Sequence, residues 1–430
     1  MDSDLPHLPV AIPGPESQAL VDLLARHESP GITARRARQG EARGTGRDPI
    51  VWARAEGASV WDVDGNRYVD LTGAFGVALI GHAHPNVVRA VRDQAGTLMH
   101  GMGDVFPNAP RIRLMERLAA LAPEGLSQCI LGLNGSDAVE AALKTAALAS
   151  GRPGVLAFWG SYHGLSYGAL AATAYKADFR APFSGQLGQH VRHLPFGENL
   201  DLVDRFVAGP ATGGEAIGTI LVEPILGRGG EVVPPEGWLP GLREIADKRG
   251  LVLVFDEIYS GLGRTGRWWA CDHEGVVPDI LCVGKALGGG MPMSACVAKP
   301  EIMAAWGRSG GEAIHTATFL GHPVAAAAAL ATLDVLEAMD APAVARGFEA
   351  TVRARLGARV RGRGAMLGVE AGSAGAGARI AGRLLREGYI VLPGGVDGDI
   401  IGLTPPLCLS DAQLKGALDA IEAALASESP

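Results

Sequence analysis

The 430-residue chain has few lysines, few cysteines and no long apolar run. Its five cysteines are scattered, odd in number and form no CxxC pair, so we expect buried thiols in a reducing compartment and no disulfide framework. The longest apolar stretch, residues 324–333, is too short to span a bilayer. The N-terminal residues carry acids and prolines where a secretory signal has basic and then apolar residues. These features predict a soluble, cytoplasmic protein.

Basic residues are outnumbered by acidic ones. Lysine and arginine total 38 and aspartate and glutamate total 46, which gives a net charge of -8. Nucleic acids and anionic membranes repel such a chain, so we expect neither as a partner. Hydrophobic residues make up 47% and charged residues 20%, a composition typical of globular enzymes and not of disordered chains. We therefore expect small-molecule partners.

The chain is too long for one compact core, and its pattern changes along its length. Residues 60–71 predict a hairpin with its turn at Asp64-Gly65. From about Pro85, helical patterns alternate with short, continuous apolar runs. These runs are residues 155–158, 217–222, 251–255 and 280–283. Buried strands separated by helices predict an α/β fold with a mostly parallel sheet covered on both faces.

The C-terminal part has a different pattern. After a long helical stretch, residues 323–339, short strands mixed with Arg-rich helices predict a smaller α+β domain. We therefore predict three segments: an N-terminal arm and part of the small domain (1–75), a large domain (76–325) and the C-terminal small domain (326–430). We expect the site at the carboxyl ends of the large domain's strands, where open α/β sheets bind ligands.

A carboxylate and a lysine each follow a predicted strand directly. Asp256 comes after residues 251–255, and a carboxylate there is costly to bury unless it meets a cation, although a structural ion pair is the simpler interpretation. Lys285 follows residues 280–283 and Gly284, with three glycines at 288–290. Desolvation in such a tight setting lowers the pKa of an amine and makes it a Schiff-base nucleophile, whereas a surface lysine would not be activated.

Two further segments lie at the start of a predicted helix or just after a predicted strand. Residues 134–140 begin with Asn-Gly-Ser-Asp, so the free amides of Gly135 and Ser136 predict a phosphate cradle, unless Ser136 or Asp137 only caps the helix. Tyr162, just past residues 155–158, offers an aromatic face for a planar ring, or packs in the core. Together with the lysine and the carboxylate, these features fit pyridoxal 5'-phosphate (PLP), a phosphorylated heteroaromatic aldehyde.

Six segments of the sequence resemble the class III (omega) aminotransferases, a family of fold-type-I PLP enzymes that includes the GABA, ornithine and acetylornithine transaminases. These segments are LVFDEIYSGLGRTGRWWA, PDILCVGKALGGGMPMSA, ILVEPI, NGSDAVEAALKTA, SYHG and HTATFLGHPVAAAAA. The resemblance runs from about Pro49 to Leu409. It implies a large domain on a mostly parallel, seven-stranded sheet, with a small domain from the N- and C-terminal segments.

The resemblance also implies roles for single residues. Lys285 would form the Schiff base and carry the proton, and Asp256 would pair with the ring nitrogen. Gly135 and Ser136 would hold the phosphate, and Tyr162 would stack on the ring. Thr318 would reach the cofactor of a neighbouring subunit, which implies a homodimer with shared active sites. The remaining implied positions are Glu223 and Phe75, which would line the substrate pocket.

The sequence departs from the family at a pair of charged positions. Relatives typically carry a second glutamate where this chain has Arg228, and an arginine where it has Gly402. In the family these two form a salt bridge, and the arginine binds the α-carboxylate of glutamate or oxoglutarate. Losing only one partner of a buried pair costs ~3–5 kcal/mol, so the paired change is physically consistent. Either Arg228 recognises an acidic group from another side of the pocket, or it points to solvent. Tyr259 also departs, since relatives usually have Gln or Met there; it either contacts the ring hydroxyl of the cofactor or only packs.

Three short motifs point elsewhere, and each fits the chemistry it suggests poorly. Gly261–Gly266 matches G-x-G-x-x-G, but no amphipathic helix follows to bind a dinucleotide. Ser166 sits in a G-x-S-x-G pattern but lies too far beyond its strand for a nucleophile elbow. His82 and His84 have no further spaced ligands, so we expect no metal site.

The sequence thus predicts a PLP-dependent aminotransferase that moves an amino group from an amine or amino-acid donor to a 2-oxo acid or aldehyde acceptor by a ping-pong mechanism. Three alternatives stay open: an aminomutase or racemase of the glutamate-1-semialdehyde aminomutase type, a relative that binds PLP without catalysis and, more distantly, a serine hydrolase that uses Ser166.

Overall fold

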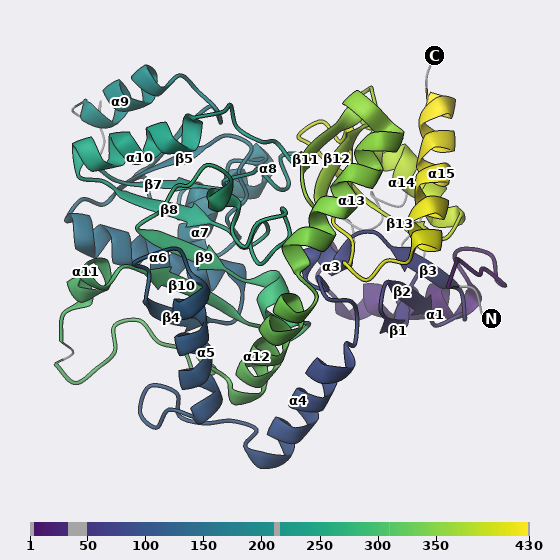
Figure 1. Ribbon diagram of the computed structural model, residues 1–430, viewed down its shortest axis with the longest axis horizontal. Coiled ribbons are helices and arrows are strands. Elements are labelled where there is room, and N and C mark those ends of the chain that lie inside the picture. Colours follow the sequence, from purple (N-terminus) through teal and green to yellow (C-terminus); the bar gives the residue numbers. More distant parts are fainter. Residues whose placement is uncertain (1–3, 33–49, 210–215, 309, 429–430) are drawn as a thin grey trace. The chain divides into compact units, whose positions relative to one another are not determined.

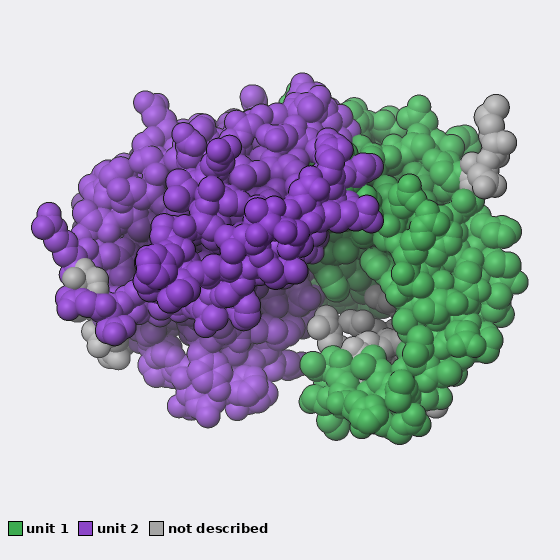
Figure 2. All heavy atoms as spheres, turned by 90° about the horizontal axis from the view of Figure 1, so that it is seen from below, with its two compact units in different colours: residues 1–84, 346–430 green, residues 85–345 purple. Residues whose placement is uncertain are grey.

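The computed structural model describes residues 4–32, 50–209, 216–308 and 310–428. It divides into two compact units, which Figure 2 colours separately. Unit 1 contains residues 1–84 and 346–430, and unit 2 contains residues 85–345. All five cysteines are free thiols. Among the described residues, no helix has both the length and the apolar character needed to cross a membrane.

Unit 2 is built on a seven-stranded sheet with strand order β4-β10-β9-β8-β7-β5-β6 (Figure 1). The strands are β4 (Gln128–Gly132), β5 (Gly154–Phe158), β6 (Val191–Leu194), β7 (Ile217–Val222), β8 (Val252–Asp256), β9 (Ile280–Val283) and β10 (Ser294–Ala298). Of these, β10 pairs antiparallel with both of its neighbours, and the other pairings are parallel. The predicted α/β fold with a mostly parallel sheet is therefore confirmed.

Helices cover both faces of this sheet. On one face α6 (Gly135–Ser150) buries alanine, valine and leucine side chains against Val254, Cys282 and Cys296. Successive strand residues point to opposite faces, so Phe158 faces the other side. There its ring packs edge-on against Trp238 at the start of α10 (Trp238–Arg249), with 4.9 Å between ring centroids. A sheet covered in this way exposes its strand ends as the accessible polar edge.

The other helices of unit 2 surround this core. They are α4 (Pro85–Thr97), α5 (Ala109–Leu121), α7 (Tyr167–Ala172), α8 (Ala177–Arg180), α9 (Leu200–Ala208), α11 (Pro300–Met303) and α12 (Pro323–Ala338). The long helix α12 packs on α4 and α5 within this unit. The boundary at 345/346 falls inside α13 (Ala341–Leu356). The domain boundaries expected from the sequence, 75/76 and 325/326, remain predictions.

Unit 1 joins the two ends of the chain. One sheet, of order β1-β2-β3-β13, combines β1 (Trp52–Glu56), β2 (Ser59–Asp62) and β3 (Arg67–Asp70) with β13 (Tyr389–Ile390). The other, of order β11-β12-β15-β14, consists of β11 (Val360–Arg363), β12 (Met366–Glu370), β14 (Leu392–Gly394) and β15 (Ile400–Leu403). The helices of this unit are α1 (Pro15–His27), α3 (Gly73–Gly76), α14 (Ala376–Arg386) and α15 (Asp411–Glu428). The expected small α+β domain built from both terminal segments is present.

Candidate active site

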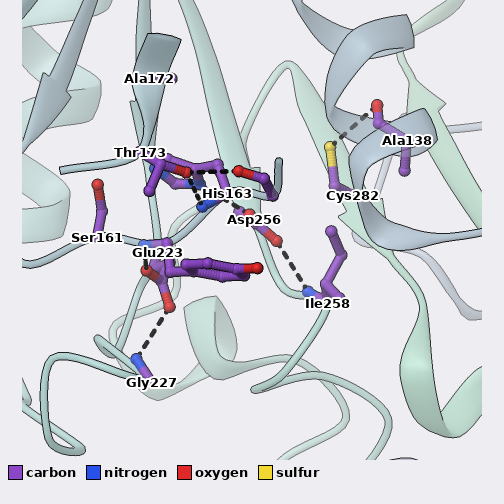
Figure 3. A network of polar contacts seen from close by, with 12 residues as sticks. Ala138, Ser161, His163, Ala172, Thr173, Glu223, Gly227, Asp256, Ile258 and Cys282 are labelled. Carbon is purple, nitrogen blue, oxygen red and sulfur yellow. Dashed lines mark hydrogen bonds and ion pairs between the residues drawn. The ribbon is translucent and has the colours of Figure 1, made fainter. Parts of the chain in front are cut away.

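Asp256 and His163 form a buried pair at the carboxyl end of β8. Asp256 is the last residue of the strand and is 5% exposed. Its Oδ2 lies 2.8 Å from Nδ1 of His163, and its Oδ1 accepts the Ile258 amide at 3.1 Å (Figure 3). For the ring to donate to a carboxylate, Nδ1 must carry the proton. The His163 amide donates to Thr173 Oγ1 at 2.9 Å, which also fixes the backbone of this residue.

Lys285 follows β9 and lies in unit 2 with this pair. Its backbone is left-handed, with φ +45°, an uncommon conformation for a residue with a side chain. Its Nζ lies over the ring of Tyr259, 4.1 Å from the centroid. Desolvation lowers the pKa of this amine to about 8, against the attraction of Asp256 and Glu223, which raises it. A substantial neutral fraction near neutral pH makes the amine a nucleophile.

Glu223 ties two loops of the site together. It follows β7 and is 6% exposed. Its Oε1 accepts the amide of Tyr162 at 2.7 Å. Its Oε2 accepts the amide of Gly227 at 2.9 Å (Figure 3). Desolvation raises the pKa of this carboxyl group, and the nearby charge of Asp256 adds to that rise. One buried carboxyl group therefore joins the loop after β5 to the loop after β7.

The guanidinium of Arg228 lies over the ring of Tyr162. The guanidinium carbon of Arg228 is 4.3 Å from the centroid of the Tyr162 ring, a cation–π distance. Both residues are half-buried. The preceding Gly227 lies close to Tyr259, because a Cβ at this glycine would be 2.5 Å from Cδ1 of that ring. Arg228 is thus partly covered by Tyr162 and only partly exposed to solvent.

The start of α6 contains the two residues predicted to bind phosphate. Asn134 caps the helix by accepting the Asp137 amide, and the Asp137 side chain completes a capping box. The cap is therefore not Ser136, whose Oγ instead accepts the Leu165 amide at 3.1 Å. Gly135 packs against Ile258, where a Cβ would lie 3.1 Å from its Cδ1. The first-turn amides of a helix have no partner within the helix, and they attract anions.

Three predicted residues lie elsewhere in the fold. Thr318 is exposed in the loop before α12. Phe75 belongs to unit 1, on the short α3, with φ +63° and a 55% exposed side chain. Gly402 also belongs to unit 1, on β15, where it pairs with Gly368.

Sequence reasoning missed two buried partners. It assigned no role to His163, although this ring bonds directly to Asp256. It also left the role of Glu257 open; this side chain accepts the Ser260 hydroxyl and the amides of Ala270 and Cys271. Desolvation raises the pKa of Glu257 to about 7. A polar side chain next to an apolar strand end was the available signal, but it does not tell a structural group from a site group.

The structure shows the surroundings of the three short motifs that point to other chemistry. Ser166 precedes α7, and its hydroxyl donates to Glu140 Oε1 at 2.8 Å, so its partner is a carboxylate and not a histidine base. Residues 261–266 form turns, followed by the buried Trp269 and the short 3₁₀ turn Ala270–His273. His82 bonds to Asp70 Oδ2 at 2.8 Å.

The residues of unit 2 fit pyridoxal phosphate. A carboxylate offers about four lone-pair positions, and the bonds of Asp256 to His163 and Ile258 use two, so it can also accept a ring N–H. The buried Nε2 of His163 has no hydrogen-bond partner among the described residues, as expected beside a group still to be bound. Lys285 supplies a partly neutral amine, and the start of α6 supplies amides for a phosphate.

Comparison with known proteins agrees with this geometry. The family Aminotransferase class-III matches residues 41–425. An acetylornithine aminotransferase from Methanopyrus kandleri is 38% identical over 385 residues, which cover 88% of this chain and 95% of that protein.

Solved structures give the same result. An (S)-enantioselective omega-transaminase from Thermomicrobium roseum has a TM-score of 0.84 at 28% identity, covering 96% of this chain and 99% of its own. An amine transaminase from an uncultivated Pseudomonas species, in its PLP-bound form, has a TM-score of 0.80 at 30% identity, covering 88% and 95%. An ornithine aminotransferase from Toxoplasma gondii has a TM-score of 0.80 at 28% identity, covering 88% and 91%. The chain belongs to the class III aminotransferases, PLP-dependent enzymes that transfer an amino group from an amine donor to a carbonyl acceptor.

Proposed function

We propose that this aminotransferase works through Lys285 and Asp256 in two half-reactions: a donor amine leaves its nitrogen at the site, and a 2-oxo acid or aldehyde then takes it away. Bound PLP supplies the electron sink for this chemistry. The observation that carries the proposal is the amine of Lys285, whose pKa is lowered to about 8, in one unit with the Asp256–His163 pair.

Each residue has a defined task in this proposal. The Lys285 Nζ takes the proton from the substrate carbon that bears the nitrogen and returns it one position away. Asp256 holds a proton on the ring nitrogen of the cofactor, and the hydrogen bond from His163 keeps that carboxylate oriented. The start of α6 holds the phosphate through Gly135 and Ser136.

Other residues surround the cofactor and the substrate. An aromatic ring has two faces, so Tyr162 can bear Arg228 on one face and receive the cofactor ring on the other. Tyr259, already against Lys285, is assigned to the cofactor hydroxyl. Glu223 and Arg228 are assigned to the substrate pocket, and the same assignment for Phe75 rests on the family resemblance alone. Acetylornithine and ornithine are the first donors to test, because similar proteins carry those names.

We also propose that the enzyme is a homodimer in which Thr318 reaches the cofactor of the neighbouring subunit. Support comes from its exposure, in a loop that lies beside the loop after α4. The Thr316 hydroxyl donates to Asp104 at 2.9 Å, and the Asn108 side chain donates to the Gly321 carbonyl at 3.1 Å. The cytoplasmic location indicated by the cysteine pattern belongs to the same proposal.

Reconstitution with PLP tests the catalytic assignment. The purified protein should gain a visible absorbance band, and borohydride should then fix the cofactor to the peptide that contains Lys285. The K285A variant should show neither, whereas K415A should behave as the wild type because Lys415 has a 71% exposed side chain in an ion pair with Asp419. A colourless wild type, or a label on another lysine, would refute the proposal.

A panel of donors then tests the reaction type. An aminotransferase loses the visible band when the donor is added and regains it only with a separate carbonyl acceptor, as ping-pong kinetics requires. An aminomutase converts its substrate without an added acceptor. A band that responds to no amine would indicate a protein that binds PLP without catalysis.

A further inference from the structure

Arg228 is a half-buried guanidinium without a polar partner in the described part of the chain. No hydrogen bond or ion pair joins it to any described residue, and its one specific contact is the face of Tyr162, at 4.3 Å. A cation–π contact uses none of the hydrogen-bond donors of the guanidinium, so its five N–H groups remain available to a ligand. Because burying charged donors without acceptors is costly, such a group indicates a ligand that supplies the acceptors.

The position of Arg228 is fixed by the carboxyl group of Glu223. This group accepts the amides of Tyr162 and Gly227, so it holds both the aromatic platform and the residue directly before Arg228. Glu223 is buried and follows β7, a strand in the middle of the sheet. The guanidinium is therefore preorganised, which reduces the ordering cost of binding a ligand there.

The charge of Arg228 acts on the reactive amine. Arg228 and Arg264 both oppose protonation of Lys285, against Asp256 and Glu223, which favour it. An anion bound to Arg228 would cancel part of its positive charge at the amine. A planar carboxylate can accept two parallel hydrogen bonds from the guanidinium of arginine. The ammonium group of lysine instead attracts a carboxylate as a point charge.

We propose that Arg228, held on the Tyr162 ring by the Glu223 clamp, is the receptor for the carboxylate of an acidic substrate. This inference rests on the proposed function, since it names the class of substrate that the same site takes: a donor or acceptor with a free carboxylate in addition to its amine or carbonyl group. Glu223 is a positioning residue here, because it acts through the two loops that it joins.

The test uses the PLP-loaded enzyme and a pair of unreactive probes of equal shape, butyrate and its neutral amide, butyramide. Calorimetry should give butyrate a dissociation constant at least about 10-fold lower than that of butyramide. In R228A the constant for butyrate should rise about 10- to 100-fold, the loss expected for a charge-assisted bidentate contact, and that for butyramide should stay unchanged. R228K should recover only part of the loss, because lysine lacks the planar fork.

Two further variants separate positioning from general damage. E223Q keeps the shape but places an NH2 group against one of the two amides, so butyrate should bind several-fold more weakly while butyramide does not change. R152A removes another half-buried guanidinium, which precedes β5 at the opposite end of the strand and donates to the Arg249 carbonyl. It should bind butyrate as the wild type does.

The kinetic readout uses donors that differ only in the carboxylate. 4-Aminobutyrate should exceed n-butylamine in kcat/KM for loss of the visible band, and R228A should abolish that preference by raising KM for 4-aminobutyrate. Equal binding of butyrate by wild type and R228A, with a normal cofactor band in both, would overturn this inference alone. Absence of the cofactor band from the wild type would instead overturn the proposed function.

Discussion

At the scale of the single residue, opposing effects set the pKa of the Lys285 amine. Desolvation and the charge of Arg228 favour the neutral amine, and the carboxylate of Asp256 favours the ammonium. The result is a pKa of about 8 in place of the ordinary 10.5. An amine in this range can accept a proton and release it again near neutral pH, as a shuttling base must.

This balance predicts how the amine titrates in the protein without cofactor. Below pH 8 Lys285 is mostly protonated, and above it the amine is neutral, so its labelling by an acylating reagent should reach half its plateau near pH 8. D256N removes a charge that raises the pKa, so its midpoint should fall. R228Q removes a charge that lowers the pKa, so its midpoint should rise. Mass spectrometry of the labelled peptides can follow the six lysines separately, with Lys415 as the exposed standard. Midpoints near pH 10.5 in all three proteins would contradict the predicted influence of burial.

The positions of Lys285 and Asp256 at strand ends were predictable because apolar runs and glycines mark these ends. Lys285 and Asp256 directly follow apolar runs, and both lie in unit 2, Asp256 ending β8 and Lys285 following β9. The partner of Asp256 was not predictable, because His163 comes from the loop after β5 and the two meet only through the strand order β8-β7-β5. The contact of Arg228 with Tyr162 has the same origin, since it joins the loops after β7 and β5.

At the scale of the element, the loop after β5 packs against the start of α6 through a glycine. A Cβ at Gly164 would lie 2.0 Å from the Ser136 Oγ, and the backbone there has φ +123°. Only glycine combines that conformation with so close an approach. The loop that carries Tyr162 and His163 is therefore held against the residues predicted to bind phosphate.

We expect G164A to weaken PLP binding by at least about 10-fold, because the new methyl group must displace Ser136 or the loop from the phosphate site. The matched control is G151A, which has a similar conformational conflict at φ +64° but meets nothing within 4 Å, at the other end of α6. Both variants should lose some stability, about 1 kcal/mol from the left-handed backbone. Fluorescence titration with PLP and thermal unfolding would separate the two effects. Equal PLP affinity in both variants would show that contact with Ser136 is unimportant.

Elements were predictable where hydrophobicity alone defines them. The bounds of β7 and β9 agree with the predicted runs 217–222 and 280–283, because both strands are buried on two faces. The sheet has three more strands that the apolar runs did not indicate. β6 reads Val-Arg-His-Leu and lies at an edge, β4 begins with an exposed glutamine, and β10 contains mostly small residues. Each of these segments forms a strand because it pairs with a neighbouring strand, and its own hydrophobic pattern does not predict one.

At the scale of the whole molecule, the two ends of the chain fold into the same compact unit. These terminal segments build unit 1, whereas the residues assigned to catalysis and phosphate binding all lie in unit 2. The sequence predicted this division from the change of pattern after residue 339. It could not define the boundary, because α12 has the composition of a core helix in either unit and only its packing on α4 and α5 assigns it to unit 2.

Unit 2 also presents an apolar loop surface around Thr318, formed by the loop after α4, the adjoining part of α5 and the loop before α12. Its exposed side chains are Met99, Met102, Val105, Phe106, Ile112, Ile314 and Phe319. Ring contact between His100 and Phe319, at 5.1 Å between centroids, joins the two loops. Exposed apolar side chains on adjoining loops favour the proposed interface, at which a second copy of the chain would bring Thr318 to a shared site.

Substituting Phe106, which is 69% exposed, therefore tests the dimer. F106D places a charge within the apolar loop surface and should raise the dimer dissociation constant at least about 100-fold, since it loses the burial of an aromatic ring, ~2–3 kcal/mol, and adds desolvation of a carboxylate. L202D, at a 38% exposed position on α9 away from these loops, should leave the dimer intact. Sedimentation analysis would measure both. T318A should keep the dimer and weaken PLP binding. A monomeric wild type, or a dimeric T318A with unchanged PLP affinity, would remove the basis for a shared active site, because the cofactor would then be held by one chain alone.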